Sequence, residues 1–394
     1  MSGGQDYIER AWRLIPHSIM NATVWATARC SLRCDYCYVY KLYENQPNKD
    51  FDADLIPDLI DFLMRHNVRG EADVWWFGGE PSLVFEDVIM RTADEAVRRG
   101  LIPGRTFRHG MTSNLTVMKD EWVEWIRRTQ FGVLVSLDGT EDTHDKHRKF
   151  PDGSGSFKVV WLNLQKLRRV RPNPEIRWTV APDTVVGLAE RIKWFLSQGL
   201  TNLAIDFVYE VEWTDADYEA LRSEFMSVRE LIRTLALSGQ AVPHIKFVRD
   251  GIVRLTGGLS YESRCGLGQG GIGVDVNGDI YLCHRAVSSR DPKLKIGNIK
   301  SGLDWRKRIL INAEWVRRGR PFSEREGRCE TCQLFGKYCI GGCLIVNYDM
   351  FGDLGVVPDT FCTIANMAVD VFEPLGRELM GNRQFAATYS LSRA

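Results

Sequence analysis

The sequence predicts an α/β protein with parallel strands, followed by a smaller cysteine-rich domain. Two features of the 394 residues support this: β-rich runs alternate with amphipathic stretches over some 200 residues, and the ten cysteines fall into two groups that more than 220 cysteine-free residues separate. Alternating strands and helices imply parallel pairing through right-handed crossovers. Either a doubly wound sheet or a barrel meets this requirement, and both gather their chemistry at the carboxyl ends of the strands.

The expected strands are short and rich in β-branched and aromatic residues. They cover residues 23–27, 73–77, a weaker run at 107–114, 132–139, 176–180 and 203–209. The expected helices carry apolar residues at helical spacing. They cover residues 54–66, 85–99, 185–199 and 218–239.

Polar clusters follow four of these strands. They are Cys30–Cys37, Gly78–Pro81, Ser113 with Asn114, and Asp138 with Gly139. Because the carboxyl ends of parallel strands meet on one rim, we expect a single site there. After about Gly251 the sequence changes to glycine-rich, cysteine-containing segments, which predicts a second domain held together by its ligands.

The composition excludes several classes of protein. Lys plus Arg and Asp plus Glu both equal 51, so no global field favours nucleic acid or an anionic membrane as a partner. The first residues lack the pattern of a secretory signal, and no apolar run approaches the ~18 residues that span a bilayer. We therefore expect a cytoplasmic protein, in which cysteines are ligands or catalysts rather than disulfides.

The first cysteine group is Cys30, Cys34 and Cys37, a CxxxCxxC spacing. A cubane iron–sulfur cluster normally takes four thiolates, so three leave one iron open to another ligand. Two alternatives exist. The same spacing places three small apolar side chains in one stripe of a helix, and zinc also takes closely spaced cysteines.

With an aromatic residue at Tyr36, this motif resembles the signature of the radical S-adenosylmethionine (SAM) family. Gly78-Gly79-Glu80-Pro81, after the second expected strand, resembles the motif that holds the SAM amino group in that family. The resemblance implies a partial (β/α)6 TIM-like barrel, in which a reduced cluster cleaves SAM to a 5′-deoxyadenosyl radical. It further implies that the SAM ribose and carboxylate meet Ser113, Asn114, Ser136, Asp138 and Arg148. The alternative is that Asn114 and Asp138-Gly139 are ordinary turn residues.

The second cysteine group resembles the SPASM extension of radical SAM peptide-modifying enzymes, with six residues instead of five between Cys332 and Cys339. The resemblance implies two auxiliary [4Fe-4S] clusters and three clusters in all. Cys329, Cys332, Cys339 and Cys362 would hold the distal one, and Cys265, Cys283 and Cys343 the nearer one. The fourth iron of the nearer cluster would be open, bound by a non-cysteine side chain or reserved for substrate, and an open or substrate-bound position is favoured. A zinc ribbon is the alternative, because CxxC pairs are typical of structural zinc sites.

These resemblances divide the chain into five parts. They are an N-terminal extension (1–20), the radical SAM barrel (21–240), a bridging region (241–264), the SPASM domain (265–365) and a C-terminal helix or tail (366–394). About twenty residues precede the first expected strand, too few for a winged-helix leader-binding module. Either a separate protein presents the leader of a precursor peptide, or the barrel and SPASM surface recognise it. An electron donor such as flavodoxin or ferredoxin is the other expected partner.

Three residues are the candidates for catalysis. His284 follows Cys283, where sulfatase-maturing relatives carry a catalytic aspartate, and either carries a proton or has a structural role. Asp206 and Glu210 lie at the end of the last expected strand. The favoured function is a peptide maturase that forms an intramolecular C–C or thioether crosslink. The alternatives are the same chemistry with another outcome, namely side-chain oxidation as in sulfatase maturation, epimerisation or a non-peptide substrate, and a non-catalytic zinc protein that binds a partner.

Overall fold

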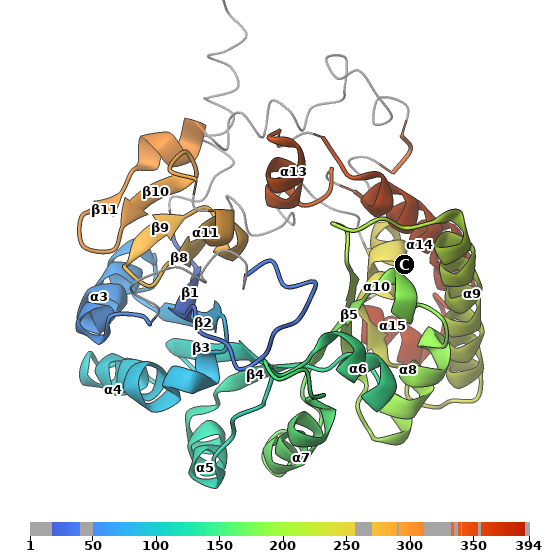
Figure 1. Ribbon diagram of the computed structural model, residues 1–394, viewed down its shortest axis with the longest axis horizontal. Helices are drawn as coiled ribbons and strands as arrows, with labels where there is room; N and C mark the ends of the chain where they lie inside the picture. Colours follow the sequence, from blue (N-terminus) through green and yellow to red (C-terminus); the bar gives the residue numbers. More distant parts are fainter. Residues whose placement is uncertain are drawn as a thin grey trace, which may run out of the picture. The chain divides into compact units, whose positions relative to one another are not determined.

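The computed structural model describes residues 18–39, 50–256, 270–289, 291–310, 332–334, 338–339, 341–353 and 356–390 (Figure 1). The chain divides into two compact units. Unit 1 comprises Met1–Val135, Asp145–Arg171 and Arg264–Arg320, and unit 2 comprises Ser136–His144, Pro172–Ser263 and Pro321–Ala394. The five predicted domain boundaries stay a prediction.

The strands of unit 1 lie in the order β11-β10-β9-β8-β1-β2-β3-β4. Strands β1 to β4 are parallel, β8 runs parallel to β1, and β8 to β11 form an antiparallel meander. The strands are β1 (Asn21–Thr27), β2 (Ala72–Gly78), β3 (Phe107–Ser113), β4 (Gly132–Ser136), β8 (Gly271–Val274), β9 (Asp279–Tyr281), β10 (Lys295–Asn298) and β11 (Gly302–Leu303).

Helices α3 (Ile56–His66), α4 (Arg91–Arg98) and α5 (Asp120–Thr129) lie between successive parallel strands of unit 1, along one side of them (Figure 1). The other helices of unit 1 are η1 (Ala53–Leu55), η2 (Pro81–Val84), η3 (Phe85–Met90), α7 (Phe157–Arg168) and α11 (His284–Ser289). The expected helix at 85–99 begins as one π-helical segment, η3, before α4. The sequence analysis omitted α5 and α7, although Trp122, Val123 and Ile126 of α5 form a buried apolar stripe.

Unit 2 contains the parallel strands β5 (Ile176–Val180), β6 (Asn202–Phe207) and β7 (His244–Ile245). Its helices are η4 (Pro182–Thr184), α8 (Leu188–Ser197), α9 (Asp215–Leu237), α10 (Lys246–Ile252), η5 (Val253–Thr256), α13 (Leu344–Phe351), α14 (Asp359–Glu378) and α15 (Arg383–Tyr389), while α6 (Glu141–His147) begins in unit 2 and ends in unit 1. Helix α9 begins before the expected Tyr218, because Thr214 and Asp217 form a capping box.

The predicted α/β class with a parallel sheet is confirmed, and all six expected strands form. Alternation along β2 and β5 buries every second residue, as a strand with one face against helices requires. In the described part of the chain, no helix is long and apolar enough to cross a membrane.

A histidine lies inside the aromatic core of unit 1. His109 of β3 is buried, and its ring contacts those of Phe107, Trp125 and Phe131, with centroids 4.5, 5.4 and 4.8 Å away. Burial lowers the pKa of His109 to about 4, because the apolar surroundings disfavour the imidazolium ion. The folded chain therefore binds this proton less readily than the unfolded chain.

The depressed pKa predicts a loss of stability in acid. Between the ordinary pKa near 6.5 and the folded value, the unfolded chain takes up a proton that the folded chain refuses, so stability falls as pH falls. From pH 7 to pH 5 the loss is about 2 kcal/mol. We expect His109→Phe to remove this component, as measured by urea unfolding at both pH values. An unchanged stability difference between variant and parent at the two pH values would contradict the assignment.

Candidate functional site

Two glycines at the end of β2 allow it to approach the end of β1 closely. The Gly79 N–H donates to the Thr27 carbonyl at 2.7 Å, and the Glu80 N–H donates to the Arg29 carbonyl at 2.8 Å. A Cβ on Gly79 would lie 2.0 Å from the Arg29 oxygen, and one on Gly78, where φ is +119°, 2.3 Å from the Thr27 oxygen. Only glycine fits this approach, which places Glu80 beside the first cysteine segment.

Glu80 is a buried carboxylate that joins β2 to β3. One oxygen accepts from Ser113 Oγ at 2.7 Å and from the Ser82 N–H at 3.0 Å, and the other accepts from the Asn114 N–H at 2.7 Å. Burial raises the pKa of Glu80, and these hydrogen bonds oppose the rise. Because each donor is neutral, the bonds hold the carboxylate in place without cancelling its charge.

Asn114 connects the same network to the cysteine segment. Its Nδ2 lies 3.3 Å from Ser31 Oγ and donates to Cys30 Sγ at 3.7 Å, while its Oδ1 accepts from Thr116 Oγ1 at 2.7 Å. The hydroxyls of Ser31 and Thr116 lie 2.6 Å apart. Sequence analysis missed Ser31 and Thr116, since single hydroxyl residues carry no spacing signal.

The residue after Asn114 is held in a strained conformation. Leu115 is fully buried and has φ 53°, a left-handed conformation that costs a non-glycine residue about 1–2 kcal/mol. Its N–H donates to Ser113 Oγ at 2.9 Å, and its carbonyl accepts from Asn163 Nδ2 of α7 at 2.8 Å. Asn163, which the sequence did not single out, therefore positions the turn that carries Asn114.

The three cysteines of the first group lie in one short, half-buried segment. The Cys37 N–H donates to the Cys34 carbonyl at 3.1 Å, and the Leu32 N–H donates to Cys30 Sγ at 3.4 Å. Burial, together with the negative charge of Glu80, raises the pKa of Cys30 to about 12. A thiolate at this position needs a nearby positive charge, which iron supplies, so the donor set fits a thiolate-ligated cluster.

Among the residues that the structure describes, no three His, Cys, Asp or Glu side chains gather closely enough to hold one metal ion. The choice between an iron–sulfur cluster and zinc at Cys30, Cys34 and Cys37 stays a prediction. The helical-stripe alternative is wrong, because Cys30, Cys34 and Cys37 lie outside any helix.

The last residue of α6 and the segment after it contact the cysteine segment. His147 Nδ1 lies 2.9 Å from an Asp35 carboxylate oxygen, and the Arg33 N–H donates to the Lys149 carbonyl at 2.7 Å. The Arg148 guanidinium lies over the Tyr36 ring, 5.5 Å from its centroid. This cation–π contact helps to hold the Arg148 side chain against the cysteine segment. The pairing of Arg148 with a SAM carboxylate stays a prediction.

His284 lies at the start of α11, beside the end of β2. Its ring contacts Phe77 edge to face, with centroids 5.0 Å apart, and its carbonyl accepts from Trp25 Nε1 at 3.3 Å. Because Phe77 directly precedes Gly78, this contact places the His284 imidazole near the Gly78–Pro81 motif. The structure therefore brings a predicted catalytic residue to the predicted cofactor motif within unit 1.

The remaining predicted cofactor residues belong to unit 2. Ser136 and Asp138 are buried. Asp138 Oδ1 accepts from the Thr179 N–H at 2.9 Å, and the Asp138 N–H donates to His144 Nδ1 at 3.2 Å. Asp138 thus has a structural role in joining the segment after β4 to β5, and its contact with SAM stays a prediction.

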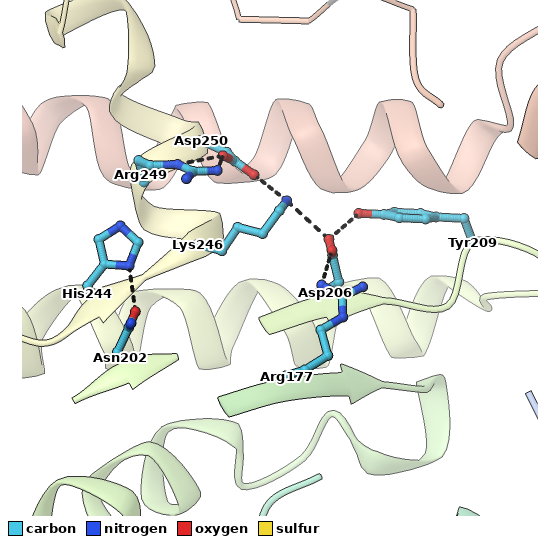
Figure 2. Close-up of polar contacts among 8 residues, drawn as sticks. All are labelled: Arg177, Asn202, Asp206, Tyr209, His244, Lys246, Arg249 and Asp250. Atoms are coloured by element: carbon cyan, nitrogen blue, oxygen red, sulfur yellow. Dashed lines mark hydrogen bonds and ion pairs between the residues drawn. The ribbon is translucent and has the colours of Figure 1, made fainter. Parts of the chain in front are cut away.

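Asp206 lies in a cluster of charged side chains (Figure 2). Burial alone would raise its pKa, but Arg177 and Lys246 outweigh this effect and lower the pKa to about 2. A carboxylate held so firmly in its ionised form is a poor proton acceptor near neutral pH. Glu210 is exposed, and its carboxylate accepts from the Tyr209 N–H at 3.1 Å.

The second cysteine group is described in part. Cys265 and Cys329 lie outside the described residues, Cys283 belongs to unit 1, and the other four belong to unit 2. The Gly341 N–H donates to Cys339 Sγ at 3.2 Å, and Asn347 Nδ2 donates to the Gly341 carbonyl at 2.8 Å. These contacts orient one sulfur, and the two predicted auxiliary clusters stay a prediction.

A methyl group at Gly79 tests the close approach of β1 and β2. Gly79→Ala forces the Arg29 carbonyl to move, so we expect it to lower the free energy of unfolding by about 1–3 kcal/mol and to reduce iron binding after anaerobic reconstitution. Gly381→Ala is the control, because nothing lies within 4 Å of its added Cβ. Equal thermal stability and iron content in the two variants would contradict this account.

Asn163 tests the strained turn separately. Asn163→Leu leaves the buried Leu115 carbonyl without its donor, so we expect a loss of about 1–3 kcal/mol in unfolding free energy and weaker SAM binding to the reconstituted protein. Lys166→Met is the control from the same helix, because Lys166 contacts the Met118 carbonyl instead. If both variants bind SAM equally well, Asn163 does not position Asn114.

Residues 26–184 match the radical SAM superfamily. A cysteine-type anaerobic sulfatase-maturating enzyme of Clostridium novyi is 28% identical over 44% of this chain and 46% of its own length. A serine-type enzyme of Bacteroides thetaiotaomicron is 30% identical over 36% of this chain and 34% of its own length. The chain thus aligns with less than half of each of these relatives.

Solved structures share the fold. The native anSMEcpe structure with bound AdoMet and Cp18Cys peptide has a TM-score of 0.71 at 18% identity, over 94% of this chain and 100% of that one. Streptococcus suis SuiB bound to precursor peptide SuiA has a TM-score of 0.57 at 14% identity, over 91% and 79%. Residues 26–184, which include the cysteine segment and the Gly78–Pro81 motif joined as described, thus match the radical SAM superfamily, and the chain shares the TIM-like barrel fold of the solved structures.

Proposed function

We propose that this chain is a radical SAM enzyme that removes a hydrogen atom from a residue of a ribosomally made peptide and forms an intramolecular C–C or thioether crosslink. The observation that carries the chemistry is the hydrogen-bonded network from Glu80 through Asn114 to Cys30. The names of the relatives and the peptides in the structures with this fold support a peptide substrate.

Different residues of unit 1 would bind the cluster and SAM. Cys30, Cys34 and Cys37 would hold a [4Fe-4S] cluster, and Glu80 would receive the cationic amino group of SAM. SAM bound to such a cluster supplies the radical that removes an unactivated hydrogen atom. Two further clusters are proposed on the second cysteine group, which makes three in total, with an electron donor such as flavodoxin or ferredoxin.

Crosslinking removes two hydrogens from the peptide. The first leaves as a hydrogen atom, and the second leaves as a proton together with one electron when the new bond forms. His284 is the candidate to accept the proton, because its imidazole contacts Phe77 beside the cofactor motif and imidazole titrates near neutral pH. The second cysteine group offers ligands for an electron acceptor.

Sulfatase-type oxidation is the second candidate. The names of the matching relatives favour it, since they are cysteine-type and serine-type anaerobic sulfatase-maturating enzymes. The residue after Cys283 argues for the crosslink, because it is histidine here, where the resemblance to sulfatase-maturing enzymes implies a catalytic aspartate. Oxidation and crosslinking of a peptide both remove two hydrogens from serine-type substrates, so fragmentation must decide between them.

The decisive assay uses the full chain, reconstituted with iron and sulfide, with SAM, a reductant and a short peptide encoded beside its gene. We expect methionine and 5′-deoxyadenosine release, and a peptide that loses two hydrogens and resists fragmentation inside a ring. Cys34→Ala should abolish all of these. If the product instead fragments at every backbone bond and carries an aldehyde on one side chain, the reaction is an oxidation and the proposed crosslink is wrong.

His284→Gln separates proton transfer from radical formation. We expect the modified peptide to form about 10²–10⁴-fold more slowly, since a positioned proton acceptor contributes about this much. Methionine release in the absence of peptide should stay within about threefold of the parent, because the ring contact that the variant removes is the one with Phe77, outside the cysteine segment. A parallel fall in both rates would show that His284 supports the fold of the site and carries no proton.

A further inference from the structure

Strands β5 and β6 have one apolar and one polar face. Trp178 contacts Phe195 of α8, and Phe207 contacts Phe225 of α9, so these alternate residues face the helices. The residues between them, including Arg177, Thr179 and Asp206, are half-buried and occupy the opposite face. A face that carries charge at this exposure meets solvent or a ligand rather than an apolar layer.

Two cations converge on Asp206 at this face (Figure 2). Arg177 Nη1 lies 2.5 Å from Oδ2, and Lys246 Nζ lies 3.2 Å from Oδ1. The side chains of Arg177 and Lys246 remain 34% and 32% exposed, against 18% for Asp206. The carboxylate is thus the covered member of the group, while both cations remain accessible from outside.

The described side chains of this cluster include more cations than carboxylates. Lys246 also reaches Asp250 at 2.7 Å, and Arg249 contacts the same carboxylate at 2.9 Å. The three cations are Arg177, Lys246 and Arg249, and the two carboxylates are Asp206 and Asp250. The low pKa of Asp206, despite its burial, shows the same positive field acting on a carboxylate at this position.

The neighbouring Tyr209 side chain adds no negative charge to the cluster. The Tyr209 hydroxyl lies 3.4 Å from Asp206 Oδ1, and burial raises the pKa of Tyr209 well above its ordinary value, so the hydroxyl stays a neutral donor. Isolated ion pairs contribute little to stability once desolvation is counted, so a half-buried group with excess charge is better explained by an incoming anion than by folding.

We propose that Arg177 and Lys246 form a subsite for a carboxylate of the peptide substrate, supplied by an acidic side chain or by its C-terminus. This inference rests on the proposed function for the identity of the ligand. The incoming carboxylate competes with Asp206 for the same two cations. Asp206 therefore limits the affinity of the subsite and gives the cations a partner when the peptide is absent.

If the peptide carboxylate competes with Asp206, removal of a cation and removal of the Asp206 charge should change the affinity for the peptide in opposite directions. The probe is a fluorescein-labelled, C-terminally amidated synthetic peptide with one glutamate among alanine, glycine, serine and cysteine, and its twin with glutamine. By fluorescence anisotropy on the anaerobically purified full chain, we expect the parent to bind the glutamate peptide about tenfold more tightly. Arg177→Gln and Lys246→Gln should abolish this preference, whereas Asp206→Asn should increase it several-fold.

A control variant and a control peptide test whether the preference for glutamate arises at Arg177 and Lys246. Lys193→Gln of α8 removes the same charge from an exposed side chain that pairs with Glu190, and it should keep the preference. A glutamine peptide with a free C-terminus tests the terminal carboxylate as the source. SAM affinity should be unchanged in every variant. A weaker SAM affinity with an unchanged peptide preference would assign the cations to the SAM carboxylate and overturn the proposal.

Folding and function are checked independently. Circular dichroism shows whether each variant folds, and Asp206→Asn decides the outcome if Arg177→Gln unfolds, because a purely structural ion pair predicts equal or weaker binding. No glutamate preference in the parent overturns the subsite. Preference without any peptide modification would refute the proposed function and leave the subsite standing.

Discussion

The buried carboxylate of Glu80 is the interaction on which the rest of the unit 1 site depends. Burying an ionised carboxylate is costly unless hydrogen bonds replace its water, and here Ser82, Ser113 and Asn114 supply them. These donors come from the first turn after β2 and from the end of β3, so satisfying one side chain fixes two strand ends relative to each other. Asn114 then connects the cysteine segment to these two strand ends through its contacts with Cys30 and Ser31.

The same constraint explains the glycines. Glu80 reaches its donors only because the backbone after β2 lies against Thr27–Arg29, an approach that any Cβ at Gly79 would prevent. The local requirements of the turn, the burial of the carboxylate and the position of Cys30 therefore agree with one another. Such agreement is what allows a short polar motif to specify a site within an otherwise apolar sheet.

Sequence patterns predicted the strands and motifs well because their signals are local. Alternation identifies β2 and β5, and the spacing of Cys30, Cys34 and Cys37 identifies their segment. Asn163 and Thr116 escaped prediction because their roles arise from contacts with residues distant in sequence or from a strained turn. The pairing of Asp206 with Arg177 and Lys246 escaped for the same reason, so the sequence predicted a candidate for catalysis where the structure places an ion pair.

Glu80 and Asp206 show how environment gives two buried carboxylates opposite electrostatic roles. Neutral donors surround Glu80, burial raises its pKa, and a cationic group beside it would favour its ionised form. Cations surround Asp206, its pKa is about 2, and the charge that remains around it is positive. In a chain whose formal net charge is zero, selectivity of this kind must come from local imbalance. A negative site therefore suits the sulfonium and ammonium groups of SAM, and a positive one suits the carboxylates that a peptide carries.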